Sequence, residues 1–117
     1  MLVNWIKCEG QQWCDFLKLN LDHSHFNSLG GVYIIWHGGQ NASVVRVGQG
    51  ESIRDRLKTH RQDPEVRKYA HLGLFATWAQ VTTANRDGIE RFLAEKWKPK
   101  VGSKFPAVPA IEVNSPW

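Results

Sequence analysis

The chain has 117 residues, of which 42% are hydrophobic and 22% charged, and its formal net charge is +4. This length provides for one domain with one core, and the composition excludes a disordered chain. The positive charge favours an anionic partner, of which nucleic acid is the commonest.

Both cysteines, Cys8 and Cys14, lie in the N-terminal segment. His23 and His25 follow them, but the spacing matches no common zinc signature. We therefore expect two reduced thiols rather than a metal site or a disulfide. No signal peptide is recognisable, and no apolar run approaches the roughly 20 residues of a membrane helix, so we expect a cytoplasmic protein without a membrane partner.

Apolar residues recur through residues 11–21, which predicts a short helix in the N-terminal segment. Residues 32–36 are β-branched and aromatic and predict a strand that is buried on both faces. The same signal returns from Ser43 to Gly48. Because a Gly- and Asn-rich loop joins the two segments, we expect them to form a β-hairpin.

The segment after the hairpin is predicted to be helical, with Ser52 as the N-cap of a helix from Ile53 to about Gln62. Pro64 can start a second short helix over residues 65–71, since proline is tolerated in a first turn. Together these elements place one or two helices between the hairpin and the next strand.

Residues 74–81 predict the third strand, and a helix is expected from Gly88 to Trp97, where Pro99 ends it. The remaining residues, 98–117, contain all the other prolines and predict an ordered but irregular tail. This order indicates an α+β fold with a small three-stranded, mainly antiparallel sheet flanked by helices.

Four short motifs lie in order along these elements. Gly31-Val32-Tyr33 opens the hairpin and Arg46-Val47-Gly48 lies on its second strand. Arg56 precedes His60 by four residues on the following helix, and Glu90 lies on the last helix. In this order the motifs resemble those of the GIY-YIG endonuclease family.

The resemblance implies a three-stranded antiparallel sheet with flanking helices and an activity that hydrolyses DNA phosphodiester bonds. It also implies one divalent metal ion as cofactor, usually Mg²⁺. The implied catalytic residues are Tyr33, Arg56 and His60, with Arg46 in the place of the second family tyrosine. Glu90 would be the metal ligand.

The resemblance covers residues 31–102 as the core of a single domain. Residues 1–30 then form an N-terminal helical extension, and residues 103–117 a Pro-containing C-terminal tail.

The residue types suit this chemistry. Phosphodiester hydrolysis needs a group that activates water, positive charge near the developing phosphorane, and a cation beside the leaving oxygen. Tyr33 would be the base or would orient the water. Arg56 and His60, four apart on a helix, point to the same side. A single carboxylate, Glu90, would leave Mg²⁺ most of its waters, which suits this metal.

Two positions depart from the family pattern. Arg46 replaces a tyrosine, and Gly102 lies where the family has an asparagine; Asn114 in the tail is a candidate substitute. Arg46 has two interpretations. In the first, Arg46 lies beside Tyr33, where its charge lowers the pKa of the phenol and its guanidinium binds phosphate. In the second, Arg46 marks a lost active site and binds only an anion or solvent.

The sequence therefore leaves three hypotheses open. The first is a Mg²⁺-dependent nuclease, and the second is a catalytically inactive module that binds nucleic acid through Arg46 and the basic helix. Arg54, Lys58 and Arg61 on that helix are then phosphate contacts, or otherwise an ordinary solvated face. The third is a protein-interaction module, including a homodimer, formed by the tryptophans and the tail.

Overall fold

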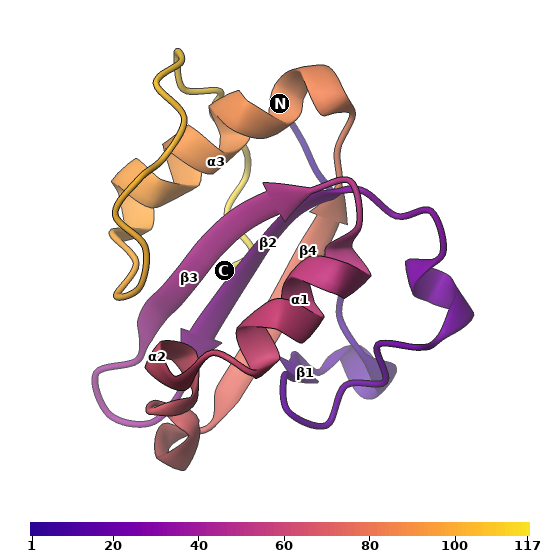
Figure 1. Ribbon diagram of the computed structural model, residues 1–117, viewed down its shortest axis with the longest axis vertical. Coiled ribbons are helices and arrows are strands. Elements are labelled where there is room, and N and C mark those ends of the chain that lie inside the picture. Colours follow the sequence, from indigo (N-terminus) through magenta and orange to yellow (C-terminus); the bar gives the residue numbers. More distant parts are fainter.

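The computed structural model describes residues 1–117 and has an α+β fold built on an antiparallel four-stranded sheet, with the strand order β1-β4-β2-β3 (Figure 1). The strands are β1 (Cys14–Asp15), β2 (Gly31–His37), β3 (Ser43–Gly50) and β4 (Leu74–Gln80). The α-helices are α1 (Ile53–Arg61), α2 (Pro64–Arg67) and α3 (Thr83–Trp97). Three short 3₁₀ turns, Glu9–Gln11, Ser24–Phe26 and Ala70–Leu72, complete the fold.

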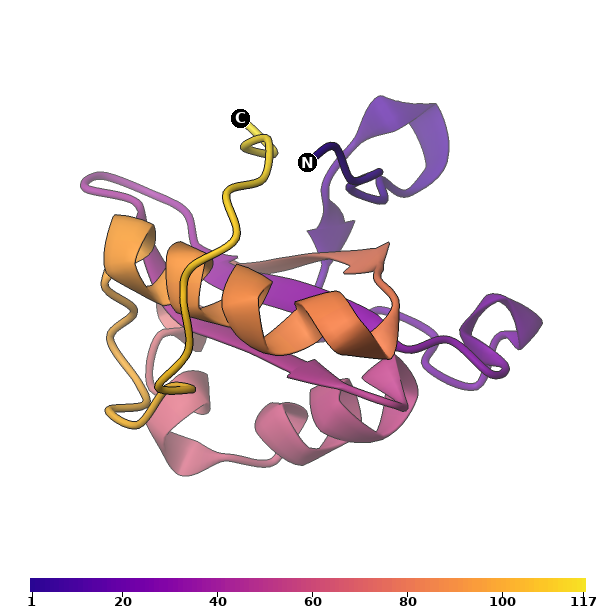
Figure 2. The same cartoon turned by 90° about the horizontal axis from the view of Figure 1, so that it is seen from above.

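Strand β2 lies between β4 and β3, and all seven of its residues are buried. Alternate residues of a strand point to opposite faces. Tyr33 and Ile35 accordingly belong to the core on the α1 side, whereas Val32 and Ile34 belong to the core on the α3 side. Viewed from above, α1 and the last residues of the tail lie on opposite sides of the sheet (Figure 2).

The predicted hairpin, the helix α1 and the strand β4 are confirmed, and residues 98–117 form no regular secondary structure, as expected. Ser52 caps α1 by accepting a hydrogen bond from the backbone N–H of Asp55. The second predicted helix is shorter than expected, because α2 ends at Arg67 and a 3₁₀ turn follows.

The sheet has four strands and not three, and the N-terminal extension is not an α-helix. Cys14 pairs with Ala76 and Asp15 with Phe75, so residues predicted as helix form β1 at the edge of β4. Cys14 and Phe16 are buried while Asp15 is exposed, which is the two-residue period of a strand. Regular helical structure in residues 1–30 is limited to 3₁₀ turns.

The cysteines are bonded to each other, in contrast to the free thiols expected from the sequence. A disulfide joins Cys8 to Cys14, and no cysteine is free. The bond closes a short loop immediately before β1, so it helps hold this segment in an extended rather than a helical path. None of the helices combines the length and the apolar character needed to cross a membrane.

Helix α3 begins at Thr83, five residues before the predicted start at Gly88. Gly88 therefore lies inside the helix, where glycine is normally unfavourable. A Cβ at this position would lie 3.0 Å from the carbonyl oxygen of Pro109 and against the side chain of Ile111. The glycine allows the tail to pack directly on α3, and the backbone N–H of Ile111 donates to the carbonyl of Gly88 at 2.9 Å.

Candidate active site

The candidate site lies on the α1 side of β3, one of the two edge strands of the sheet. Arg46, Gly48 and Gly50 follow one another at two-residue spacing on this side. A Cβ at Gly48 would overlap the phenol of Tyr33, and a Cβ at Gly50 would lie 2.7 Å from Cγ of Arg56. Because the two glycines have no side chains, the side chains of Tyr33 and Arg56 can lie directly on the backbone of β3, the floor of the site.

Tyr33 and His60 meet above this floor. The Tyr33 hydroxyl oxygen lies 2.5 Å from Nε2 of His60, and the two residues are 0% and 3% exposed. Burial lowers the pKa of His60 to about 4, and the charges of Arg46 and Arg56 act in the same direction. At neutral pH the imidazole is therefore uncharged, and its nitrogen can accept the phenolic proton.

Tyr33 remains protonated for the same physical reason. Burial raises the pKa of its phenol, although the charges of Arg56 and Arg46 oppose this rise. The sequence led us to expect that Arg46 lowers the pKa of Tyr33. Arg46 does act in that direction, but the loss of hydration outweighs it. The resting pair is thus a neutral phenol and a neutral imidazole.

Two arginines supply unpaired positive charge beside this pair. Arg46 and Arg56 each have a buried Nε atom without a hydrogen-bond partner. Neither guanidinium forms an ion pair. Buried donors normally have partners, so two adjacent guanidiniums with unused donors form a place where an anion would be stabilised.

Glu90 approaches the site from α3. Its carboxylate accepts a hydrogen bond at 3.2 Å from Nε2 of Gln49, and the same nitrogen donates to Asp87, one turn earlier on α3. Burial raises the pKa of Glu90, and Asp87 adds to this effect, whereas the charges of Arg56 and Arg46 oppose it. Glu90 is therefore close enough to both arginines to interact with them.

The carboxylate of Glu90 is a hard oxygen ligand of the kind that Mg²⁺ accepts, and its partner is an uncharged amide rather than a cation. The chain contains no group of three or more His, Cys, Asp or Glu side chains arranged to hold a metal ion. A magnesium ion at this place would have one protein carboxylate and otherwise water as its ligands, and Asp87 shares the Gln49 amide with Glu90.

Gly102, at the position where the GIY-YIG motif pattern would have an asparagine, lies next to Arg46. A Cβ at Gly102 would be 3.2 Å from a terminal nitrogen of the Arg46 guanidinium. Asn114 does not take over this place, because its side chain accepts a hydrogen bond from the backbone N–H of Val3 and donates to the Val3 carbonyl. The two positions at which the sequence departs from the motif pattern that it resembles, Arg46 and Gly102, are therefore neighbours in the structure.

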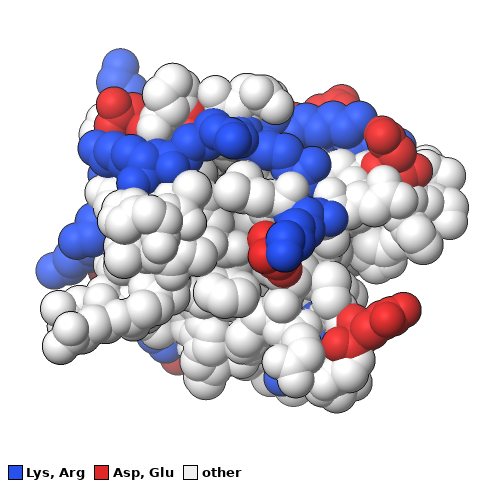
Figure 3. Space-filling model, turned by 90° about the horizontal axis from the view of Figure 1, so that it is seen from below, with Lys and Arg blue, Asp and Glu red and all other residues white.

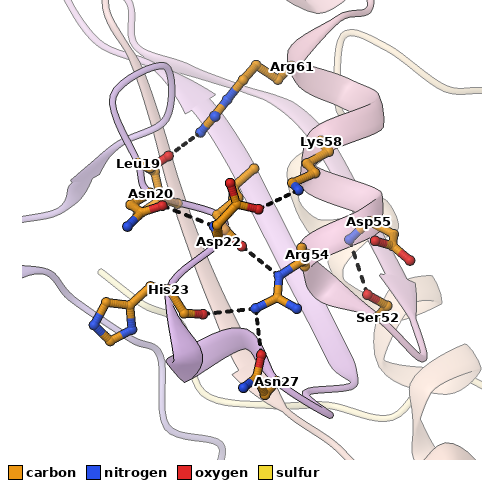
Figure 4. A network of polar contacts seen from close by, with 11 residues as sticks. Leu19, Asn20, Asp22, His23, Asn27, Ser52, Arg54, Asp55, Lys58 and Arg61 are labelled. Atoms are coloured by element: carbon orange, nitrogen blue, oxygen red, sulfur yellow. Dashed lines mark hydrogen bonds and ion pairs between the residues drawn. The ribbon is translucent and has the colours of Figure 1, made fainter.

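Basic side chains form a band along the side of the molecule that carries α1 (Figure 3). Most of the α1 cations are engaged with the N-terminal extension, as Figure 4 shows. Arg54 donates to the carbonyls of Leu21 and His23 and to the side chain of Asn27.

Two further basic residues of α1 hold the same segment. Lys58 pairs with Asp22 at 2.7 Å, and Arg61 donates to the carbonyls of Phe16 and Leu19. Lys58 lies on the solvated face that the sequence suggested, but all three side chains already have partners in the N-terminal extension and so are not free phosphate contacts. Of the four Lys and Arg residues in α1, only Arg56 faces the candidate site.

The structure thus brings together all five site residues predicted from the sequence, namely Tyr33, Arg46, Arg56, His60 and Glu90. It adds Gln49, Gly50 and Asp87, which we did not predict. Gly50 had a usable signal, because it follows Gly48 at strand spacing. No family model, no curated protein and no solved structure matches this chain.

Proposed function

We propose that the chain is a GIY-YIG-like nuclease domain that hydrolyses DNA phosphodiester bonds with one divalent cation. The observation that carries this proposal is the 2.5 Å contact between Tyr33 and His60 above Gly48, with two unpaired guanidiniums alongside. A neutral proton acceptor, two fixed positive charges and a carboxylate are the groups that phosphodiester hydrolysis requires.

Arg46 and Arg56 are proposed to bind the scissile phosphate. Guanidinium groups present donors in a planar fork that matches phosphate oxygens. Because each side chain has an unused Nε donor in the free protein, phosphate binding would satisfy groups that are otherwise buried without a partner. The same contacts would stabilise the negative charge that develops on the phosphorane.

Tyr33 and His60 are proposed to move the proton. The attacking water transfers a proton to the Tyr33 oxygen while the phenolic proton passes to Nε2 of His60. In the free protein the low pKa of His60 opposes this transfer. A phosphate bound to Arg46 and Arg56 would neutralise the charges that disfavour the imidazolium, so substrate binding itself would make His60 a stronger base.

Glu90 would hold the metal ion, and Gln49 and Asp87 would fix the direction of its carboxylate. A bound divalent cation supplies positive charge at the leaving oxygen in this class of reaction. Burial raises the pKa of Glu90, so at acidic pH protons would compete more strongly with the metal ion for this carboxylate.

A second candidate function is supported by the contact between Gly102 and Arg46. At the two places where the family has a tyrosine and an asparagine, this chain has a guanidinium beside a glycine. Arg46 and Arg56 together are sufficient to hold a phosphate without cutting. The alternative is therefore a catalytically inactive nucleic-acid-binding module on the same fold.

Nicking of supercoiled plasmid DNA in the presence of Mg²⁺ tests the first candidate. We expect nicking by the wild type, none in EDTA, and a loss of about 10²-fold or more in Tyr33→Phe and Glu90→Gln. Glu95→Gln, on the exposed face of the same helix, is the matched control and should nick like the wild type.

The result also separates the two candidates. Absence of nicking with Mg²⁺, combined with salt-sensitive DNA binding that Arg46→Gln and Arg56→Gln abolish, would exclude catalysis and support the binding module. Nicking by Glu90→Gln at the wild-type rate would remove the metal role of Glu90.

A cytoplasmic location and a homodimer remain proposals from the sequence. The cytosol keeps most thiols reduced, so alkylation of Cys8 and Cys14 at the moment of cell lysis tests the location. Two alkylated thiols are expected for a cytoplasmic protein, and protection of both by a disulfide would contradict it. Sedimentation at micromolar concentration tests the homodimer, and a strictly monomeric species would exclude it.

A further inference from the structure

A hollow lies at the far end of the hairpin, on the opposite side of the sheet from Tyr33. It has a volume of about 330 Å³ and is lined by Trp36, Ala42, Ser43, Val44, Trp97 and Trp117. The Trp117 ring lies edge-on to Trp36 and Trp97, with centroid distances of 4.9 and 5.0 Å. Trp117 is 48% exposed, so part of this aromatic surface remains open to a ligand.

A segment with lysines that have no acidic partners runs beside this hollow, which we call the indole pocket. None of the lysines from Lys96 to Lys104 forms an ion pair, and all are exposed. The ammonium of Lys96 is 5.3 Å from the Trp97 ring centroid. The backbone N–H of Lys100 donates to the carbonyl of Val44, a residue that lines the pocket. The basic segment therefore runs directly beside the indole rings.

The charge decides between two kinds of aromatic site. Clustered indoles in other proteins bind cations such as methylated ammonium groups. Here the neighbouring lysines would repel a cation, and they favour a ligand that combines a flat π-system with negative charge. A nucleobase attached to phosphates has both properties, and base stacking on aromatic side chains tolerates any base.

We propose that the indole pocket binds an unstacked base of single-stranded nucleic acid, with the flanking phosphates along the lysines of residues 96–104. A strand is favoured over a single nucleotide because the segment carries four unpaired lysines, at 96, 98, 100 and 104, which is more positive charge than one phosphate needs. The proposal rests on the proposed nucleic-acid function for the class of ligand, but it uses none of the residues of the candidate active site.

Fluorescence anisotropy of a labelled oligothymidylate in EDTA tests the pocket without any hydrolysis. We expect Trp117→Ala to weaken binding about five- to tenfold and Trp117→Phe to retain most of the affinity. Lys98→Gln and Lys100→Gln should flatten the dependence on salt, whereas Lys18→Gln, the same change on an exposed lysine elsewhere, should not. An abasic strand of equal length should bind weakly and be insensitive to Trp117→Ala.

Three results would overturn the proposal. The first is equal binding of oligothymidylate by the wild type and Trp117→Ala, both shown to be folded by thermal unfolding. The second is competition by thymidine monophosphate as effective as that by the strand, and the third is a preference for duplex that ignores Trp117. Failure of plasmid nicking leaves these outcomes unchanged, so the pocket and the proposed catalysis are tested independently.

Discussion

The phenol of Tyr33 lies directly over Gly48, its partner across the β2–β3 ladder. The contact leaves no space for a Cβ, so the glycine of the second motif is required by the tyrosine of the first. The two motifs are therefore one structural unit, in which the length of the Tyr33 side chain places its hydroxyl against His60.

Replacing Gly48 by alanine should displace this phenol. We expect Gly48→Ala to lower the free energy of unfolding by about 1–3 kcal/mol, as other overpacked sites do. Chemical denaturation measures the change. In a Tyr33→Ala background the overlap is absent, so the added cost of Gly48→Ala should largely disappear. Equal costs in the two backgrounds would show that the phenol is not what excludes a side chain at position 48.

The low pKa of His60 predicts a loss of stability in mild acid. The folded protein has a His60 pKa of about 4, below the ordinary value of 6.5, so the unfolded chain binds the proton first as pH falls. The contribution of His60 to the free energy of unfolding is therefore fully present above about pH 6.5. It decreases as the pH falls towards about 4, by about 3 kcal/mol in total. Urea unfolding at a series of pH values measures this change, and His60→Gln should show a smaller acid dependence. Parallel profiles for the two proteins would contradict the pKa shift.

Reduction of the disulfide should destabilise the N-terminal extension. For the loop closed between Cys8 and Cys14 the chain-entropy argument gives about 2 kcal/mol. Urea unfolding with and without a reductant measures the effect, with Cys8→Ser/Cys14→Ala as the control that no longer responds to the reductant. Identical wild-type stability under both conditions would mean that the bond does not constrain the unfolded chain.

Arg61 should matter more for stability than Lys58, although both lie on α1. Arg61→Ala leaves the part-buried carbonyls of Phe16 and Leu19 without their donor and should cost about 1–3 kcal/mol. Lys58→Ala removes only an exposed ion pair with Asp22, which contributes less than about 1 kcal/mol. Thermal unfolding compares the two variants. A larger loss in Lys58→Ala would contradict the role assigned to Arg61.

The elements that the sequence predicts well are those whose signals are local. The hairpin follows from two β-branched runs and a glycine-rich turn, and α1 follows from the Ser52 cap. The prediction of a helix in the N-terminal extension was wrong because the spacing of its apolar residues suits a helix as well as a strand. Its conformation depends on pairing with Ala76, sixty-two positions after Cys14, and no local pattern contains that information.

The candidate site shows the same division. The four-residue spacing along one helix predicts that Arg56 and His60 act together. The order of the motifs predicts that Tyr33 and Glu90 belong to the same site. The protonation of Tyr33 could not be predicted, because it depends on how deeply tertiary packing buries the phenol. Gln49 was missed because only the register of β3 against α3 places its amide between two carboxylates.

The contacts of Asn114 constrain the order in which the protein can be completed during synthesis. Val3 exchanges two hydrogen bonds with the Asn114 side chain, and the indole of Trp5 donates to its carbonyl. A ribosome makes residues 3–5 more than a hundred residues before their native partner. These contacts must therefore wait until Asn114 has been released, and the N–H of Val3 should be among the later groups to gain protection from solvent exchange.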